Sequence, residues 1–242
     1  MPISLRPRLQ TLCLAALVLI GSMQSLTLAA PATKPADDET AYEQAISKRA
    51  DGAVTALELG DAKDKAAAVH EIIVSQYRAL RDWHAMNDAP LKAARKAAGN
   101  KADAAKAGEA EKQAAEIDAS LKKLHTEFLD KLSAHLTPTQ VDVVKDQMTY
   151  NVVHVTYNAY MSLYPNLKEE EKAQIMAWLI EAREPAMDGG TSDEKHAIFG
   201  KYKGRINNYL SKQGYDTSQG KKPAKPKTSA PATMPVEATK AE

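Results

Sequence analysis

Apolar residues recur every three or four positions along most of the chain, which is the spacing of one face of an α-helix. The first such stripe has members four, four, three and four residues apart: Tyr42, Ile46, Ala50, Ala53 and Leu57. The sequence contains no strand-like alternation of apolar and polar residues. We therefore predict an all-α fold, a single helical bundle of about six helices over residues 40–215.

The second predicted helix runs from about Ala62 past His84. Proline disfavours a helical conformation in the residue before it, so we expect a break or kink at Pro90. Residues 91–119 are rich in Ala, Lys, Glu and Asp. Alanine favours a helix but buries little apolar area. We expect either a projecting helical hairpin or a solvated arm of the bundle, with its turn at Gly99–Asn100.

A capping box begins at Thr137, with Pro138 at the first helical position and Gln140 three residues after the cap. It starts a helix that Pro165 should end. Within it, Gln147–Leu167 carries no formal charge, although 26% of the whole chain is charged. A solvated helix normally carries Lys and Glu, so we interpret this segment as the central helix around which the others pack.

Two further helices are predicted after this segment. Acidic residues open the first, at residues 168–187, and Pro185 should kink or end it. A second capping box at Thr191–Glu194 starts the last helix, which Gly214 should stop.

The two ends of the chain differ from the helical region. Arg6 and Arg8 precede an apolar run, which predicts a cleaved signal peptide at residues 1–29 and a periplasmic or secreted protein, with no membrane insertion after cleavage. A retained N-terminal anchor is the alternative. We expect a flexible leader at 30–39 and a disordered Lys/Pro/Ala-rich tail at 216–242.

Composition excludes several classes of function. Signal cleavage would remove Cys13, the only cysteine, and leave 30 basic against 31 acidic residues. This balance argues against a nucleic-acid partner. No two histidines lie three or four residues apart, and Asp193-x-x-His196 is the only ligand-like spacing, so we expect no metal and no cofactor.

The charge-free helix also carries a polar stripe at helical spacing, with a tyrosine beside it: Gln147, Asn151, His154, Asn158 and Tyr157. Two interpretations remain open. The stripe is either a buried hydrogen-bonded network that fixes the helix register, or the floor of a polar cleft for a neutral or weakly charged ligand.

Two other groups are candidates for chemistry. A basic group resembles an anion-binding edge, although cations late in a helix also complement its dipole: Arg183, Lys201, Lys203 and Arg205. An acid/base set would exist if these residues converged with one another or with His154: Glu181, Glu184, Asp188 and His196. No hydrolase motif supports an enzyme, so an enzymatic activity stays the less favoured alternative.

Three segments resemble an exported bacterial family, domain-of-unknown-function family 3826: Asp146–Tyr160, Ala177–Gly190 and Glu194–Leu210. Members tend to come from bacteria that degrade plant or algal polysaccharides, so the resemblance implies a role near glycan uptake or breakdown. It implies no catalytic residues.

A shorter segment, Leu136–Gln140, is similar to the LTxxQ motif of periplasmic chaperones of the Spy and CpxP type. This resemblance implies a protein that binds unfolded envelope proteins. Three hypotheses follow. The first is a non-enzymatic protein that binds a glycan or an envelope protein, the second a glycan-active enzyme with its site around the central helix, and the third a chaperone-like protein.

Overall fold

The computed structural model describes residues 34–100 and 102–218, and within them every regular element is a helix, which confirms the all-α prediction. Seven helices are present there rather than about six: α1 Lys34–Ala56, α2 Lys63–Ala98, α3 Ala104–Ser133, α4 Pro138–Met148, α5 Val152–Leu163, α6 Glu169–Met187 and α7 Ser192–Lys212. The predicted signal peptide and most of the predicted tail lie outside the described residues. Helix α1 already begins at Lys34, inside the predicted flexible leader.

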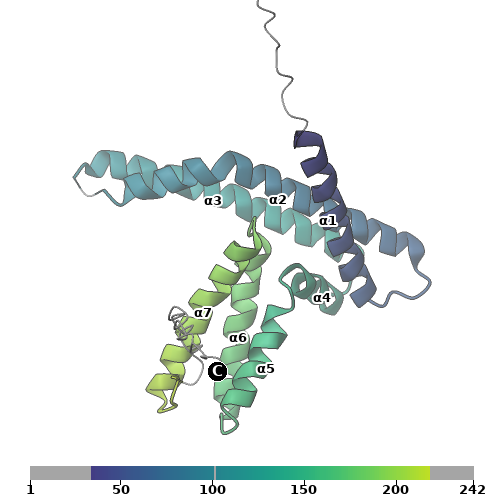
Figure 1. Cartoon of the computed structure of the whole chain (residues 1–242). Coiled ribbons are helices and arrows are strands. Elements are labelled where there is room, and N and C mark those ends of the chain that lie inside the picture. The colour runs from purple at the N-terminus through teal and green to yellow at the C-terminus, as the bar shows by residue number, and fades with distance from the viewer. Residues whose placement is uncertain (1–33, 101, 219–242) are drawn as a thin grey trace, which may run out of the picture.

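The helices form two units with separate cores (Figure 1). In the first, α1 and α4 pack on the α2–α3 hairpin around buried side chains such as Ile46, Ile73 and Phe128. In the second, α5, α6 and α7 surround Ile175, Leu179 and Phe199. The apolar stripes seen in the sequence are therefore the inner faces of two smaller cores.

The α2–α3 hairpin extends beyond the first unit, as one of the two sequence interpretations proposed (Figure 1). Its turn lies at Gly99–Asn100, as predicted, and a small cluster that includes Trp83 and Leu91 holds the two helices together. Of the break or kink predicted at Pro90, the break does not occur, because α2 continues through this residue. Packing of the flanking Trp83 and Leu91 against α3 offsets the hydrogen bond that proline cannot make.

The single central helix is also corrected by the structure. The Thr137 capping box is present and starts α4, and the helical region ends at Leu163 as expected. Between them, however, Tyr150 and Asn151 have φ of +57° and +55°. Two consecutive left-handed residues cannot belong to an α-helix, so the charge-free segment is divided between α4 and α5.

One side-chain and one backbone hydrogen bond explain where this break falls. The Thr149 hydroxyl donates to the Lys145 carbonyl at 2.8 Å, and the Asn151 backbone N–H donates to the Asp146 carbonyl at 2.7 Å. These bonds satisfy the last carbonyls of α4 locally. The chain then changes direction and enters the second unit as α5.

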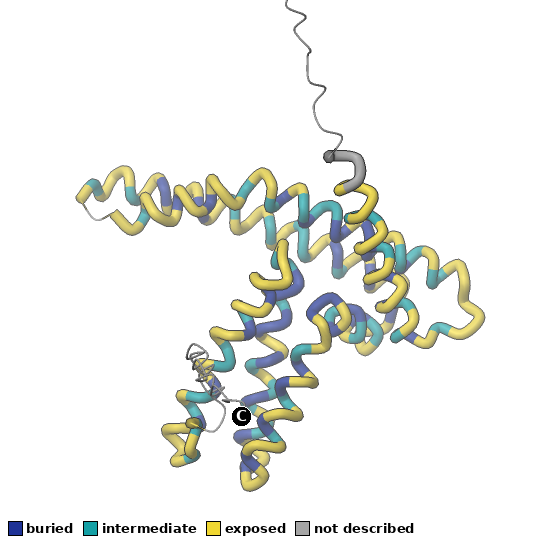
Figure 2. The backbone as a smooth tube through the Cα atoms, viewed as in Figure 1, coloured by how far each residue is buried: buried dark blue, intermediate teal, exposed yellow. Residues whose placement is uncertain are grey.

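The predicted polar stripe is exposed rather than buried. Gln147, Asn151, His154 and Asn158 are all solvent-exposed, and Tyr157 is half-buried (Figure 2). The stripe therefore does not form a buried network that fixes the helix register. The break at Tyr150–Asn151 rotates α5 relative to α4, so the four residues no longer share one helix face.

Candidate functional site

A pocket of about 220 Å³ lies where the two units meet. Helices α1 and α2 form one wall, Tyr150 from the α4–α5 junction forms a second, and the α6–α7 turn with the start of α7 closes it. The lining residues are Tyr42, Ala45, Arg49, Tyr77, Leu80, Arg81, Tyr150, Gly189, Gly190, Thr191, Ser192 and Lys195. Three are cations, three are tyrosines, and none is acidic.

Lys195 is the most buried charge in this lining, at 4% exposed. It occupies an apolar position of α7, on the same face as Phe199, Ile206 and Leu210. Its ammonium donates to the Met187 carbonyl at 2.9 Å and to the Met148 carbonyl at 3.3 Å. These carbonyls end α6 and α4, where a cation is favoured.

The ammonium forms no ion pair with a carboxylate anywhere in residues 34–100 or 102–218. Burial lowers the pKa of Lys195 to about 8, and the nearby Arg49 acts in the same direction, while Asp188 and Glu194 oppose the shift. An anion bound beside Lys195 would supply the missing counter-charge.

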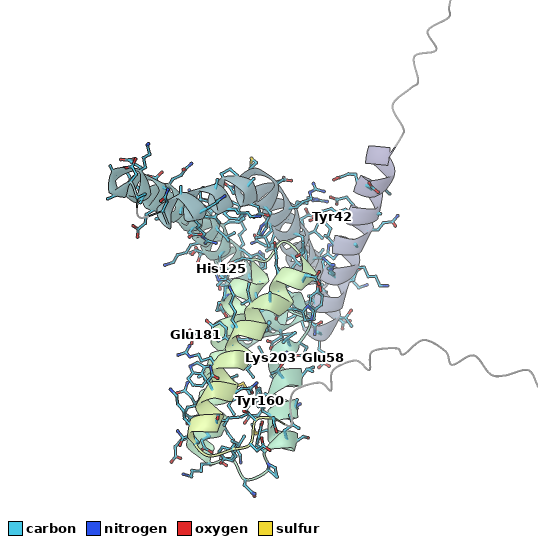
Figure 3. All side chains as sticks on the ribbon, turned by 60° about the vertical axis from the view of Figure 1, so that its left-hand side comes forward. Tyr42, Glu58, His125, Tyr160, Glu181 and Lys203 are labelled. Carbon is cyan, nitrogen blue, oxygen red and sulfur yellow. The ribbon has the colours of Figure 1, made fainter. Side chains whose placement is uncertain are left out.

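Two arginines and two tyrosines form the opposite wall. Arg49 lies over the Tyr77 ring at 5.5 Å and Arg81 over the Tyr42 ring at 4.3 Å. Arg81 also pairs with Glu39 at 2.9 Å, whereas Arg49 pairs with no carboxylate within the described chain. Tyr42, labelled in Figure 3, donates its hydroxyl to the Tyr77 carbonyl at 2.8 Å. The pocket therefore contains one arginine and one lysine without carboxylate partners.

The third tyrosine holds a strained position. Tyr150 has a left-handed backbone, which costs about 1–3 kcal/mol for a non-glycine residue and is often found at functional sites. Its ring is stacked on His196, with centroids 5.9 Å apart and planes 13° apart. The side chain is 41% exposed, so the strain positions a ring at the pocket rather than in a core.

The α6–α7 turn brings backbone close to side chains. A Cβ on Gly190 would lie 2.9 Å from the His84 ring, and one on Gly189 would lie 3.1 Å from Cγ of Lys195. His84 contacts two acceptors, the Asp188 carbonyl at 2.7 Å and the Asp88 carboxylate at 2.8 Å. Burial lowers the pKa of His84, but these acceptors outweigh it and raise the pKa overall. Gly190 thus lets the turn close against His84 of α2, and Gly189 leaves space for the Lys195 side chain of α7.

A network of paired charges lies behind this turn. His125, labelled in Figure 3, bonds Asp188 at 2.9 Å and lies 3.5 Å from Glu184. Asp188 and Glu184 raise the pKa of His125 to about 9. Burial raises the pKa of Glu184, but His125 and Lys145 outweigh it and hold that pKa at about 2. Every one of these charges has an opposite partner.

The predicted acid/base set is only partly brought together. Glu184 and Asp188 converge on His125, which the sequence did not indicate, while Glu181 contacts Tyr202 and Arg205 elsewhere. Among the residues that the structure describes, His196 hydrogen bonds to Ser192 alone. His154 lies 3.1 Å from Asp146, and its side chain is 54% exposed.

The predicted anion-binding edge is divided among three places. Arg183 is 5% exposed and is bound by Asp142 and Asp146. Lys201 and Arg205 line a shallow groove beside Trp178, while Lys203 lines another groove with Tyr160. Figure 3 shows Lys203, Tyr160 and Glu181 on the second unit, away from Tyr42. The four residues therefore do not form one anion-binding edge, and only Lys201 and Arg205 lie together.

The sequence did not single out the cations that line the pocket. The only sequence signal for Lys195 is its position among the apolar residues of the last helix, which indicates a buried charge. Arg49 gave no signal, because an arginine on a surface helix is ordinary. No group of three or more His, Cys, Asp or Glu side chains in the described ranges is placed to hold a metal ion. Nor does any helix there combine the length and apolarity needed to cross a membrane.

The model of a family described as protein of unknown function (DUF3826) matches residues 43–230, more than half of the chain. The chain belongs to the DUF3826 family. No curated protein matches its sequence.

The segments that carry the resemblance to DUF3826 meet at the pocket. Asp146–Tyr160 supplies Tyr150, Ala177–Gly190 supplies the two glycines of the turn, and Glu194–Leu210 supplies Lys195. The chaperone-like motif has a local structural explanation, because Thr137 and Gln140 form the capping box of α4. The fold thus gathers the three DUF3826 segments at one site.

Proposed function

We propose that this DUF3826 protein is an exported, non-enzymatic binding protein whose pocket takes a small anionic ligand, with a sugar acid as the first candidate. The observation that carries the proposal is the lining: three cations and no acidic residue, with Arg49 and Lys195 lacking carboxylate partners in the described chain.

Charge alone favours an anion. Carboxylates bound by arginine or lysine form charge-assisted hydrogen bonds, which are roughly twice as strong as neutral ones. Thr191 and Ser192 add the amino-terminal end of α7, where the helix dipole also favours negative charge. Lys195 supports the same conclusion, because a cation buried without a carboxylate costs stability, and a bound anion would offset that cost.

The tyrosines favour a ring-shaped ligand that also has hydroxyl groups. Each combines an apolar ring face with a polar hydroxyl. The Tyr77 hydroxyl hydrogen bonds to nothing in the described chain, and burial raises its pKa to about 12, so it stays protonated and can donate. A volume of about 220 Å³ lies below the ~300–1,000 Å³ of pockets for drug-sized ligands. A single sugar unit with a carboxylate combines these properties.

Calorimetric titration of residues 30–242 tests the proposal. Galacturonate and glucuronate are compared with galactose and glucose, their neutral counterparts, and with inorganic phosphate and sulfate. We expect the sugar acids to bind at least about tenfold more tightly than the neutral sugars, which corresponds to ~1.4 kcal/mol. Binding of phosphate and sulfate alone would reduce the proposal to a simple anion site.

A matched pair of variants locates the binding. Arg49→Gln should weaken sugar-acid binding by about tenfold or more. Lys48→Gln makes the same change of charge at the preceding residue, which is also exposed but does not line the pocket, and should leave affinity unchanged. Equal affinities for Arg49→Gln and the unmodified protein would reject the site.

The same samples separate a binding protein from an enzyme. The sugar acid, and an oligogalacturonide tested beside it, should be recovered unchanged by mass spectrometry. Formation of a product would replace the proposal with the glycan-active enzyme considered above.

A further inference from the structure

The Lys195 amine has two fixed hydrogen-bond acceptors in the wall of the pocket. Nζ donates to the Met187 carbonyl at 2.9 Å and to the Met148 carbonyl at 3.3 Å. A neutral amine keeps two N–H groups and gains a lone pair. Both carbonyls therefore keep a donor when the third proton leaves. Nζ also lies 5.9 Å from the centre of the Tyr77 ring, which lines the pocket, so the amine lies beside the cavity.

The surroundings of this amine favour loss of that proton. Burial is the largest effect and lowers the pKa of Lys195 to about 8, with the Arg49 guanidinium acting in the same direction. Asp188 and Glu194 oppose this shift but do not reverse it. At pH 7 such an amine is neutral more than about a hundred times as often as one with the ordinary pKa of 10.5. A desolvated lysine beside a second cation is the kind that attacks carbonyl carbons.

We propose that Lys195 holds its ligand covalently and reversibly, as an imine with a carbonyl carbon of the bound acid, while Arg49 pairs with the carboxylate. Such an imine rests on the proposed function, because it forms in the same pocket and with the same anionic ligand. Cζ of Arg49 lies 5.5 Å from the centre of the Tyr77 ring and Nζ of Lys195 lies 5.9 Å from it. Both cations are thus near one ring, and one small molecule can contact both.

Imine formation balances without an oxidant, a reductant or a cofactor. The neutral amine adds to the carbonyl carbon, and one amine proton moves to the carbonyl oxygen, which becomes a hydroxyl group. This group takes up a second proton and leaves as water, while the nitrogen lone pair forms the C=N bond. The protonated imine keeps one N–H for a backbone carbonyl and keeps its positive charge beside the carboxyl-terminal ends of α4 and α6. Hydrolysis reverses these steps and releases the ligand unchanged.

This chemistry narrows the ligand class to acids that also carry an aldehyde or a ketone. A free sugar acid has an aldehyde in its open-chain form, and a 2-oxo acid has a ketone next to its carboxylate. A sugar acid inside a polysaccharide has neither, because its anomeric carbon is held in a glycosidic bond. The pocket should therefore bind a released sugar acid or another small oxo acid, and not an internal unit of a chain.

Reductive trapping followed by peptide mapping tests the imine. Residues 30–242 are incubated at pH 7 with cyanoborohydride and one of three acids: galacturonate, pyruvate as a simple 2-oxo acid, or methyl galacturonide, which has the carboxylate but no free carbonyl. A reduced imine leaves the protein heavier by the mass of the ligand minus one oxygen atom. We expect this adduct on Lys195 with galacturonate or with pyruvate, which distinguishes the two carbonyl sources, and no adduct with methyl galacturonide.

A second lysine and three variants provide the controls. Lys48 is exposed but lies outside the pocket, and the adduct on Lys195 should exceed that on Lys48 by at least about tenfold. Arg49→Gln should reduce the Lys195 adduct several-fold, because it removes the partner of the carboxylate and the neighbouring cation together, while Lys48→Gln should not. Lys195→Arg keeps the charge but cannot form an imine, so the total adduct should fall to the level of surface lysines.

The possible outcomes separate the imine from the proposed function. Calorimetric binding of galacturonate and methyl galacturonide with equal affinity, without an adduct on Lys195, overturns the imine and leaves the anion-binding pocket intact. Adducts spread equally over Lys195 and Lys48 show ordinary surface labelling and also overturn the imine. Failure of every acid either to bind or to label Lys195 rejects both the imine and the proposed function.

Discussion

Arg183 and Lys195 are both buried cations, at 5% and 4% exposed, yet their surroundings are opposite. Arg183 belongs to a network in which Asp142, Asp146 and Glu184 surround the guanidinium. Within the described residues, Lys195 bonds two backbone carbonyls and no carboxylate, and it faces a pocket without acidic residues.

Under the proposed function, the difference separates charges that serve the fold from charges that would meet a ligand. Where each cation has its carboxylate, as at Arg183 and His125, the network joins the α2–α3 hairpin to α4 and α6. At Lys195 and Arg49 the counter-charge is missing. A polar cluster alone is thus a weak indication of a binding site, and the lack of a partner is a better one.

The largest effect is expected from removing the cation of the paired network. Arg183→Met leaves Asp146 buried without its main partner, and breaking a buried ion pair costs about 3–5 kcal/mol. Urea denaturation should show this loss. The control Arg205→Met removes an exposed pair with Glu181 and should cost less than about 1 kcal/mol. Equal losses of stability in Arg183→Met and Arg205→Met would mean that the buried network does not stabilise the packing of these helices.

The second prediction uses pH to break the same network. The pKa of His125 is raised from 6.5 to about 9, so its ion pairs add stability that is complete below about pH 6.5 and is lost as the pH rises through 9. His125→Gln should therefore cost about 2–3 kcal/mol at pH 6 and almost nothing at pH 10. Urea denaturation across this range measures the difference. His135→Gln, at an exposed position just after α3, should show no such dependence.

The third prediction concerns the α6–α7 turn, which lies between the Arg183 network and the Lys195 pocket. Gly190→Ala places a methyl group 2.9 Å from the His84 ring, which two hydrogen bonds hold in place. We expect a loss of about 1–3 kcal/mol, as in other overpacked sites. Gly200→Ala is the control, because its Cβ would meet open space within α7 and should stabilise the helix by about 0.5–1 kcal/mol. Thermal denaturation should therefore separate the two variants in opposite directions.

The smallest change in stability, and the sharpest contrast with Arg183, is expected at Lys195. Lys195→Met removes two hydrogen bonds but also removes the cost of burying an ammonium, so stability at pH 7 should change by no more than about 1 kcal/mol. Sugar-acid binding should be lost. A cost comparable to that of Arg183→Met would show that Lys195 serves the fold.

The pH dependence of Lys195 has the opposite sign to that of His125. Its folded pKa of about 8 lies below its ordinary value of 10.5, so the burial cost is present below pH 8 and is relieved as the pH rises toward 10.5. The unmodified protein should therefore gain stability relative to Lys195→Met over this range, as measured by urea denaturation.

The sequence by itself determined the features that depend on neighbouring residues. The helical class, the capping boxes at Thr137 and Thr191, and the turn at Gly99–Asn100 all follow from side chains within one helical turn. Such signals act locally, so they can be read from the sequence without knowing which helix packs against which.

Only the tertiary structure decided where the charge-free segment breaks and which side of it faces water. The break depends on the left-handed pair Tyr150–Asn151, which packing of the two units must stabilise. It also decided the pocket: Arg49, Tyr77 and Lys195 lie on three helices and are distant in sequence. Periodicity predicts which face of a helix is apolar, but convergence depends on how the helices cross, and that is fixed by contacts between them.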